Sequence, residues 1–162
     1  MSNDKVVFRA AVFAIVRNEQ GEVLLHRRAH TGYMDGYYDF PSGHVEIDEG
    51  FTEATVRELA EETSIRADES DLRLMHLSIN HTDYPYINAV FAVEKWQGKP
   101  RILEPEKCDA MGFFPLDELP EKCTLTVRYV ERAGFETPIA TSYIDKDGFK
   151  RLIGVDSDEV IG

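Results

Sequence analysis

Three glutamates stand at positions that one face of a helix would share. Glu58, Glu61 and Glu62 are spaced i, i+3 and i+4, so a helix would present all three carboxylates on the same side. Like charges stacked in this way oppose one another by about a few tenths of a kcal/mol per pair, and a bound cation would offset that repulsion. Carboxylate oxygens suit Mg²⁺ or Mn²⁺. The spacing therefore predicts a divalent-cation site on a helix.

A solvated helix face is the ordinary alternative for any one of these glutamates. The stretch from Glu53 to Glu62 holds four glutamates and one arginine, so the usual cationic partners at i, i+4 are missing. Gly43 and Glu49 precede this stretch, and a glycine allows the backbone to approach a ligand closely. The combination favours a binding site over a merely soluble surface.

A helix from about residue 52 must carry these carboxylates. Thr52 is a suitable N-cap and Glu53 suits the first turn, where a negative charge interacts favourably with the helix dipole. The less polar side chains form a stripe that we expect to pack on a sheet, namely Val56, Leu59, Ala60 and Thr63.

Strands and a second helix surround this element in the sequence. Apolar runs predict strands over residues 6–16, 23–25, 39–40, 72–79 and 87–93, the first two joined as a hairpin through a turn at 18–21. A second helix is expected over 125–133, closed by Gly134, and a last hairpin over 142–155. The order predicts an α/β (α+β) chain with a mixed sheet packed against helices.

The composition is that of a globular protein. A chain of 162 residues with 43% apolar and 30% charged residues fits one domain, residues 1–162. We find no apolar stretch of membrane-span length and no signal peptide, so we expect a cytoplasmic protein without a membrane partner. Cys108 and Cys123 are expected to be reduced thiols. The net charge of −12 argues against a nucleic-acid partner.

The region from residue 43 to residue 65 resembles a known signature. Its specified positions are those of the Nudix box of the Nudix hydrolase superfamily, which includes MutT-like pyrophosphohydrolases; the matching residues are Gly43, Glu49, Arg57, Glu58, Leu59, Glu61, Glu62 and Ile65. Ser64 replaces the final glycine of the box. Serine in a left-handed position at a helix end costs on the order of 1 kcal/mol and removes no predicted ligand.

The resemblance extends beyond the box and implies a fold. Residues 27–29 and 40–46 resemble the segment that leads into the box in many members, and residues 104–107 and 113–120 resemble a later loop and turn. The resemblance implies that residues 6–135 form the core of a Nudix domain, an α/β/α sandwich with a mixed sheet between helices. Residues 140–156 would then add a C-terminal hairpin.

The resemblance also implies an activity and roles for residues. Nudix enzymes hydrolyse a nucleoside diphosphate linked to another moiety, with Mg²⁺ or Mn²⁺ as the cofactor. Glu58 and Glu62 would be the main metal ligands, with Glu61 and the Gly43 carbonyl close by. Arg57 would orient the glutamates, and Glu49 would pair with that arginine as a structural residue.

The general base and the remaining ligands are less firmly indicated. A carboxylate must take the proton of the attacking water; Glu58 is the first choice, and Glu61 is a further catalytic candidate. Glu104 and Glu106 are candidates for an additional ligand or for the base, although an exposed acidic loop accounts for either one equally well.

Three residues are predicted to contact the substrate. Arg28 follows the strand at 23–25 and resembles an arginine that contacts substrate in related enzymes, whereas Arg27 would point to the opposite face. Tyr33 and Tyr38 are candidates for stacking on a nucleotide base, although aromatic residues near turns often serve packing instead.

The substrate remains open at this level. A nucleoside triphosphate or a small modified nucleotide is the leading expectation, with release of pyrophosphate or phosphate. The alternatives are a nucleotide sugar, ADP-ribose or a dinucleoside polyphosphate, and a Nudix module that senses nucleotides without turnover. Members of the family are often dimers, so a homodimer is a further expectation.

Overall fold

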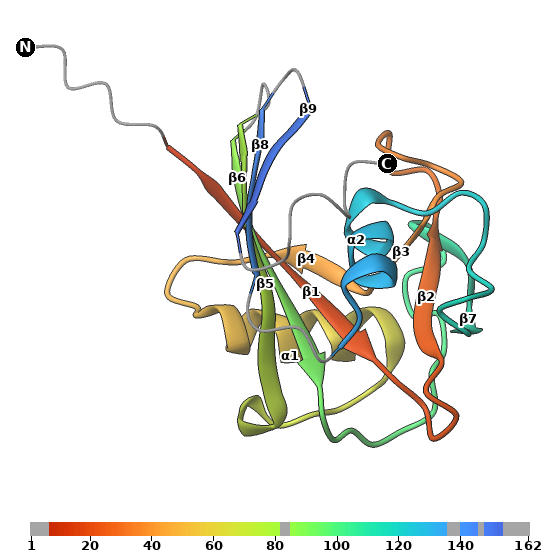
Figure 1. Cartoon of the computed structure of the whole chain (residues 1–162). Coiled ribbons are helices and arrows are strands. Elements are labelled where there is room, and N and C mark those ends of the chain that lie inside the picture. The colour runs from red at the N-terminus through yellow and green to blue at the C-terminus, as the bar shows by residue number, and fades with distance from the viewer. Residues whose placement is uncertain (1–6, 82–84, 136–139, 146–147, 154–162) are drawn as a thin grey trace, which may run out of the picture.

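A larger mixed sheet and a smaller antiparallel sheet lie between the helices of this chain (Figure 1). The computed structural model describes residues 7–81, 85–135, 140–145 and 148–153. The strands of the larger sheet follow the order β4-β1-β6-β5-β8-β9, and their bounds are β1 Arg9–Val16, β4 Ser42–His44, β5 Leu72–His81, β6 Tyr86–Val93, β8 Ala140–Asp145 and β9 Gly148–Ile153. The smaller sheet has the order β3-β2-β7, with bounds Tyr38–Asp39, Val23–Arg28 and Cys108–Phe114.

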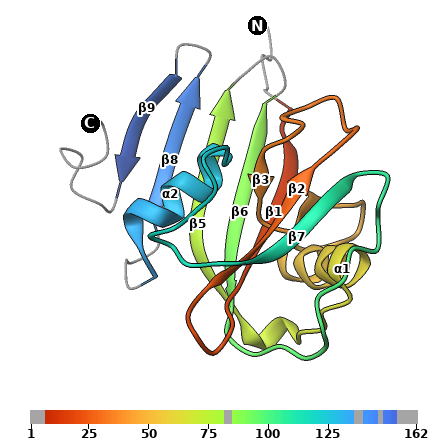
Figure 2. The ribbon, with the colours of Figure 1, turned by 90° about the vertical axis from the view of Figure 1, so that its right-hand side faces the viewer.

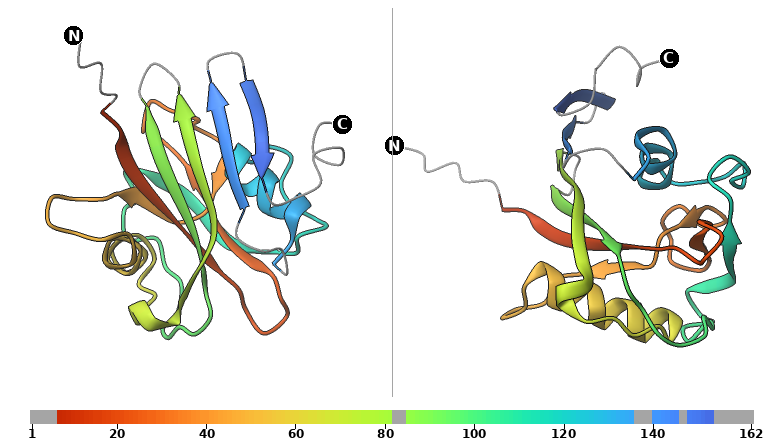
Figure 3. Two further views of the ribbon diagram at one scale, coloured as in Figure 1. Left: turned by 60° about the vertical axis from the view of Figure 1, so that its left-hand side comes forward. Right: turned by 60° about the horizontal axis from the view of Figure 1, so that its bottom comes forward.

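The two α-helices cover opposite sides of the strands. Helix α1 spans Phe51–Thr63 and α2 spans Leu125–Ala133, and a short 3-10 helix, η1, spans Glu69–Asp71. The right-hand view of Figure 3 shows α1 on one side of β1 and α2 on the other. Parallel pairing of β1 with β6 and antiparallel pairing of β5 with β6 make the larger sheet mixed. The predicted α/β class with helices against a mixed sheet is confirmed.

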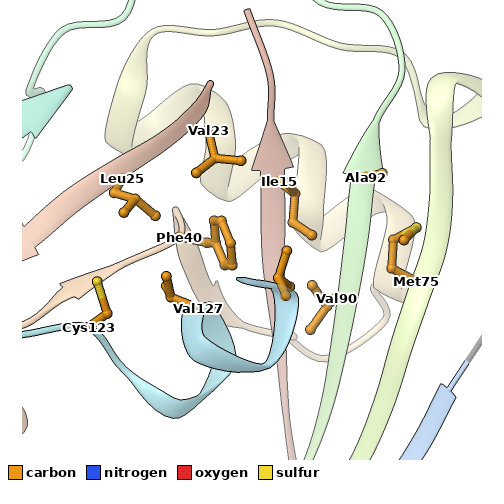
Figure 4. Close-up of a cluster of buried hydrophobic side chains, with 10 residues drawn as sticks. Ile15, Val23, Leu25, Phe40, Met75, Val90, Ala92, Cys123 and Val127 are labelled. Carbon is orange, nitrogen blue, oxygen red and sulfur yellow. The ribbon is translucent and has the colours of Figure 1, made fainter. Parts of the chain in front are cut away.

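The core has one part on each side of the large sheet. Under α2, Val127 and Val130 pack with side chains from both sheets, and Phe40 is fully buried at the centre of that cluster (Figure 4). Under α1, Leu59 and Ile65 pack against Leu24 of β2. Burying an aliphatic or aromatic side chain of this size contributes about 1.5–3 kcal/mol. The apolar side chains of the carboxylate-bearing helix therefore anchor it against the strands.

The predicted hairpin between the first two strands is wrong. β1 pairs on its two edges with β4 and β6, so neither edge is free for β2. β2 instead pairs with β3 and β7, and one isolated bridge, Arg17 to Val23, joins the two strands. β2 therefore belongs to the smaller sheet, which lies against the C-terminal end of α1.

The ends of α1 differ slightly from the prediction. The helix begins at Phe51 with Gly50 as its N-cap, not Thr52. Glu53 accepts a 2.7 Å hydrogen bond from the Gly50 N–H, which satisfies a donor at the helix start. Ser64 caps the other end in the left-handed conformation, with φ 67°, as its place in the box predicts.

Helix α2 and the C-terminal hairpin agree with the sequence expectations, whereas β2 and β5 extend beyond the predicted 23–25 and 72–79, and β4 and β7 were not predicted as strands. α2 begins and ends at the predicted residues. β8 and β9 pair antiparallel within the predicted C-terminal hairpin, of which residues 146–147 and 154–155 lie outside the described part. Within that part, no helix is long and apolar enough to cross a membrane.

Candidate active site on helix α1

The three glutamates of α1 differ sharply in exposure. The side chains of Glu58 and Glu62 are 17% and 12% exposed, whereas that of Glu61 is 56% exposed. Glu58 and Glu62 are one turn apart and face the strands, and Glu61 points outward between them. The inward pair is therefore the part of this face that water solvates least.

Arg57 ties this face of the helix to the segment that precedes it. Its Nε and Nη2 donate to the two carboxylate oxygens of Glu49 over 2.7 and 2.9 Å. Its Nη1 donates to Glu58 over 2.8 Å and to Glu61 over 3.1 Å, and Nη2 also donates to the His44 carbonyl. Glu61 therefore has a cationic partner at i, i+4, contrary to the sequence expectation. The bidentate contact lowers the pKa of Glu49 to about 2. One guanidinium thus fixes the orientation of three carboxylates.

Glu62 is the most deeply placed carboxylate of the group. Its Oε2 accepts a 2.9 Å hydrogen bond from the Ser42 backbone N–H. Burial raises the pKa of Glu62 to about 8, and the negative charges of Glu58 and Glu104 act in the same direction. Burial likewise raises the pKa of Glu58, although Arg57 opposes that shift. The positive charge around Glu58 and Glu62 therefore does not fully offset the cost of burying their ionised carboxylates.

Gly43 lies directly against the Glu58 carboxyl group. A Cβ atom built on Gly43 would overlap the carboxyl carbon and both oxygens of Glu58. Gly43 is in β4, which pairs with β1, so the backbone there cannot shift freely. The absence of a side chain at residue 43 is what makes room for the Glu58 carboxylate.

The turn that follows residue 103 brings a further acid to the site. The chain between β6 and β7 runs past the C-terminal end of α1 (Figure 2), where the Leu103 N–H donates to the Glu62 carbonyl over 3.1 Å. Glu104 is next in sequence, and its charge raises the pKa of both Glu58 and Glu62. Glu106 is exposed, and its charge raises the pKa of Lys107. The structure thus brings Glu104, rather than Glu106, toward the acids of α1.

Strands β2 and β3 supply a buried pair of titratable side chains beside Glu62. His26 and Asp39 are directly opposite one another in the two strands, and both are 5% exposed. His26 Nδ1 lies 3.7 Å from Glu62 Oε2, and burial lowers the pKa of His26 to about 4. Burial raises the pKa of Asp39 to about 6, against hydrogen bonds from Thr124 Oγ1 and the Phe40 N–H. The set of site residues predicted from the sequence contained neither His26 nor Asp39.

Substituting Asp39 with asparagine should change the pH dependence of stability. A folded-state pKa of about 6 above an ordinary 3.8 means that Asp39 contributes stability at low pH that is lost as pH rises through 6. The Asp39→Asn variant should therefore gain about 2 to 3 kcal/mol relative to wild type between about pH 4 and pH 7.5, measured by urea unfolding.

The control variant, Asp109→Asn, should change the pH dependence of stability in the opposite direction. Arg27 holds the pKa of Asp109 below its ordinary value, so the stability that Asp109 contributes is lost as pH falls. Asp109→Asn should accordingly lose stability relative to wild type as pH rises. A stability difference between Asp39→Asn and wild type that does not change with pH would contradict this description of Asp39.

Arg28 extends from the end of β2 into an ordered loop. Its Nε donates to the Tyr33 carbonyl over 2.9 Å and its Nη2 to Thr31 Oγ1 over 3.2 Å. Its charge lowers the pKa of both His26 and Asp39, which places it on the side of the sheet where Glu62 lies. Arg27, by contrast, forms a bidentate ion pair with Asp109 on β7. Arg27 and Arg28 are thus adjacent in sequence but contact different partners.

The two tyrosines predicted to stack on a base lie in different environments. Tyr33 is 69% exposed, and the Arg28 guanidinium lies 5.5 Å from its ring centroid. Tyr38 packs edge-on against Phe114 and against the core cluster under α2. Tyr33 is therefore available to a ligand near Arg28, whereas Tyr38 serves packing in this structure.

The chemistry of the acids fits a divalent cation. Among the described residues no three acid, histidine or cysteine side chains are gathered closely enough to surround one ion; Glu58 accepts a hydrogen bond from Arg57, and Glu62 accepts one from the Ser42 N–H. Glu58 and Glu62 nevertheless face inward with raised pKa values, and Gly43 leaves the space that the Glu58 carboxylate occupies. A hard dication with oxygen ligands would offset this concentration of negative charge.

Comparisons with known proteins show the family of this chain. A family model described as NUDIX domain matches residues 7–132. The chain is 35% identical over 103 residues to the 8-oxo-dGTP diphosphatase of Escherichia coli (strain K12), covering 64% of this chain and 79% of that protein. It is 30% identical over 106 residues to Phosphatase NudJ of the same strain, covering 65% of this chain and 68% of that protein.

A solved structure extends the similarity to three dimensions. The MutT NUDIX hydrolase from Burkholderia pseudomallei superposes with a TM-score of 0.73 at 25% identity, covering 80% of this chain and all (100%) of that chain. The family match spans most of the chain and includes α1, Gly43 and Glu49. This chain belongs to the NUDIX domain family and is a hydrolase that acts on pyrophosphate bonds.

Proposed function

We propose that this hydrolase requires Mg²⁺ and cleaves a phosphoanhydride bond of a nucleoside triphosphate or a small modified nucleotide. The observation that carries the proposal is the inward pair Glu58 and Glu62, poorly solvated and oriented by Arg57 and the Ser42 N–H. Similarity to a protein named 8-oxo-dGTP diphosphatase supports a nucleotide as the substrate class.

The residues divide the chemistry among them. Glu58, Glu62 and Glu104 would hold the cation, with the Gly43 carbonyl as a further oxygen and Glu61 at the outer edge of the site. A bound Mg²⁺ supplies positive charge that offsets the phosphate oxygens and lowers the pKa of water. Arg57, held by Glu49, keeps the carboxylates in place during the reaction.

Glu58 is the proposed general base. Its pKa is raised by burial, and a carboxylate whose pKa is closer to neutrality accepts a proton from water more readily. The oxygen of that water forms a bond to phosphorus, the bridging P–O bond breaks, and the proton moves to Glu58. The leaving phosphate or pyrophosphate carries away the bonding electron pair.

A substrate panel tests the proposal. Nucleoside triphosphates, modified nucleotides, nucleotide sugars, ADP-ribose and dinucleoside polyphosphates are incubated with the full chain and Mg²⁺, and released phosphate and pyrophosphate are measured separately. We expect a nucleoside triphosphate to give the highest kcat/KM. Preferred hydrolysis of a diphosphate conjugate would show that the substrate class is such a conjugate and not a nucleoside triphosphate. If no compound were hydrolysed in a metal-dependent way, the proposal would be overturned.

Arg28 is the proposed contact to substrate phosphate, and its removal should affect binding more than turnover. Arg28→Ala is expected to raise KM about tenfold with little change in kcat, because a lost charge-assisted hydrogen bond is worth about 1.5–3 kcal/mol. Steady-state kinetics measures both constants. Arg27→Ala, which removes the neighbouring arginine and its ion pair with Asp109, is the matched control. An unchanged KM in Arg28→Ala would place the phosphates elsewhere.

A further inference from the structure

Lys107 is a cation fixed beside the acids of α1. It closes a turn in which the Lys107 and Cys108 N–H groups both donate to the Glu104 carbonyl over 3.0 Å. The Ala29 N–H donates to the Lys107 carbonyl over 2.8 Å, and Cys108 opposes Arg28 across β2 and β7. The backbone of Lys107 is thereby held at the end of β2, next to Arg28.

The ammonium group of Lys107 lies among carboxylates from two segments. Its Nζ is 2.8 Å from Glu104 Oε1. The pKa of Lys107 is raised first by Glu104 and also by the charges of Glu62 and Glu106. Glu104 in turn influences both Glu58 and Glu62. Lys107 thus offsets negative charge at this end of the acid group.

An ordinary surface ion pair differs from this one in its surroundings. Lys95 pairs with Asp71 over 3.5 Å and its side chain is 82% exposed; Asp71 is in η1 and is not a candidate ligand of the cation. The Lys107 side chain is 56% exposed and Glu104 only 28%, and the same Glu104 is a candidate ligand of the cation. The position of the pair, rather than its strength, distinguishes it.

We propose that Lys107 is an exchangeable counter-ion of the cation site, which pairs with Glu104 in the metal-free protein and turns to a substrate phosphate when Glu104 becomes a ligand. This inference rests on the proposed function. A carboxylate oxygen that coordinates a dication has little remaining attraction for an ammonium, and the two positive charges repel. The lysine side chain is long and has rotatable donors, and Arg28 lies beside it on the neighbouring strand, so two cations would then face the substrate phosphates.

Calorimetric titration of Mg²⁺ into the full chain without nucleotide tests the first half of the proposal. Lys107→Met is expected to bind Mg²⁺ about twofold to fivefold more tightly than wild type, because an exposed pair worth up to about 1 kcal/mol no longer competes for Glu104. Lys107→Arg should bind as wild type does. Lys95→Met, which removes an equal charge and another exposed ion pair, is the matched control and should also bind as wild type.

Steady-state kinetics with a nucleoside triphosphate at saturating Mg²⁺ tests the second half. Lys107→Met should raise KM about threefold to tenfold with kcat nearly unchanged, and Lys107→Arg should restore KM. Mg²⁺ affinity that is equal or weaker in Lys107→Met than in wild type, or an unchanged KM, would overturn the exchange while the proposed function stands. Absence of Mg²⁺ binding to wild type would overturn both.

Discussion

Glu58→Gln is expected to lower kcat by about a hundredfold to ten-thousandfold while the protein remains folded. Glutamine has the shape of glutamate and retains an oxygen that can accept the hydrogen bond from Arg57 Nη1. It carries no negative charge for a cation and cannot accept the proton of the attacking water. The loss of general base catalysis alone is worth about that factor.

Single-turnover and steady-state rates of pyrophosphate release measure this effect, and thermal unfolding shows that the variant is folded. Glu94→Gln is the matched control, because Glu94 also accepts a short hydrogen bond from an arginine, 2.7 Å from Arg73 Nε, yet lies outside the site. That control should retain the wild-type rate. Wild-type turnover in Glu58→Gln would remove Glu58 from the mechanism.

Gly43→Ala is expected to lower kcat/KM about a hundredfold through the position of one carboxylate. The added methyl group would occupy the space of the Glu58 carboxyl group, so Glu58 must turn away or α1 must move from β4. A displacement of about 1 Å at a reacting group costs on the order of a hundredfold in rate. The backbone of Gly43 is not in the left-handed region, so alanine is acceptable there in conformation and the effect is steric.

A second strand glycine provides the comparison for this variant. The Cβ of alanine at Gly112 in β7 would meet the Phe114 ring at 3.6 Å, an ordinary van der Waals contact. Gly112→Ala should therefore retain near wild-type kinetics. If Gly43→Ala were as active as Gly112→Ala, then the close approach of Glu58 to Gly43 would have no part in catalysis.

The parts of the fold that depend on local sequence were predicted well. α2 spans the predicted residues 125–133 and ends before Gly134, a residue type that commonly closes helices. Ser64 adopts the left-handed conformation expected at the end of α1. The C-terminal hairpin also joins segments that are adjacent in sequence, since β8 and β9 pair antiparallel. Each of these features is decided within a few residues of itself.

Pairings between distant segments were predicted less well. Residues 23–25 were assigned to a hairpin with the first strand because the two runs are adjacent in sequence, but β7, more than eighty residues later, supplies the partner. The buried stripe of α1 also differs: Leu59 and Thr63 are buried as predicted, but Ala54 and Thr55 are buried in place of Val56 and Ala60. The angle at which a helix meets a sheet is a tertiary property that periodicity alone does not give.

The same limit applies to the site. The glutamates of α1 share one helix, so their spacing predicted a common face, and burial then separated Glu61 from the other two. His26 and Asp39 are thirteen positions apart and meet only through the pairing of β2 with β3. The alternation of Leu24, His26 and Arg28 along one strand was the available signal, since it places His26 on the same face as the predicted substrate arginine.

Titration of Mg²⁺ into wild type, Glu58→Gln and Glu94→Gln, followed by calorimetry, tests most directly whether the inward carboxylates of α1 hold the cation. Wild type and Glu94→Gln should bind Mg²⁺ with equal affinity, and Glu58→Gln should bind it at least about tenfold more weakly, since one charged oxygen ligand is lost. Equal affinity in all three proteins, or no binding to wild type, would contradict this assignment.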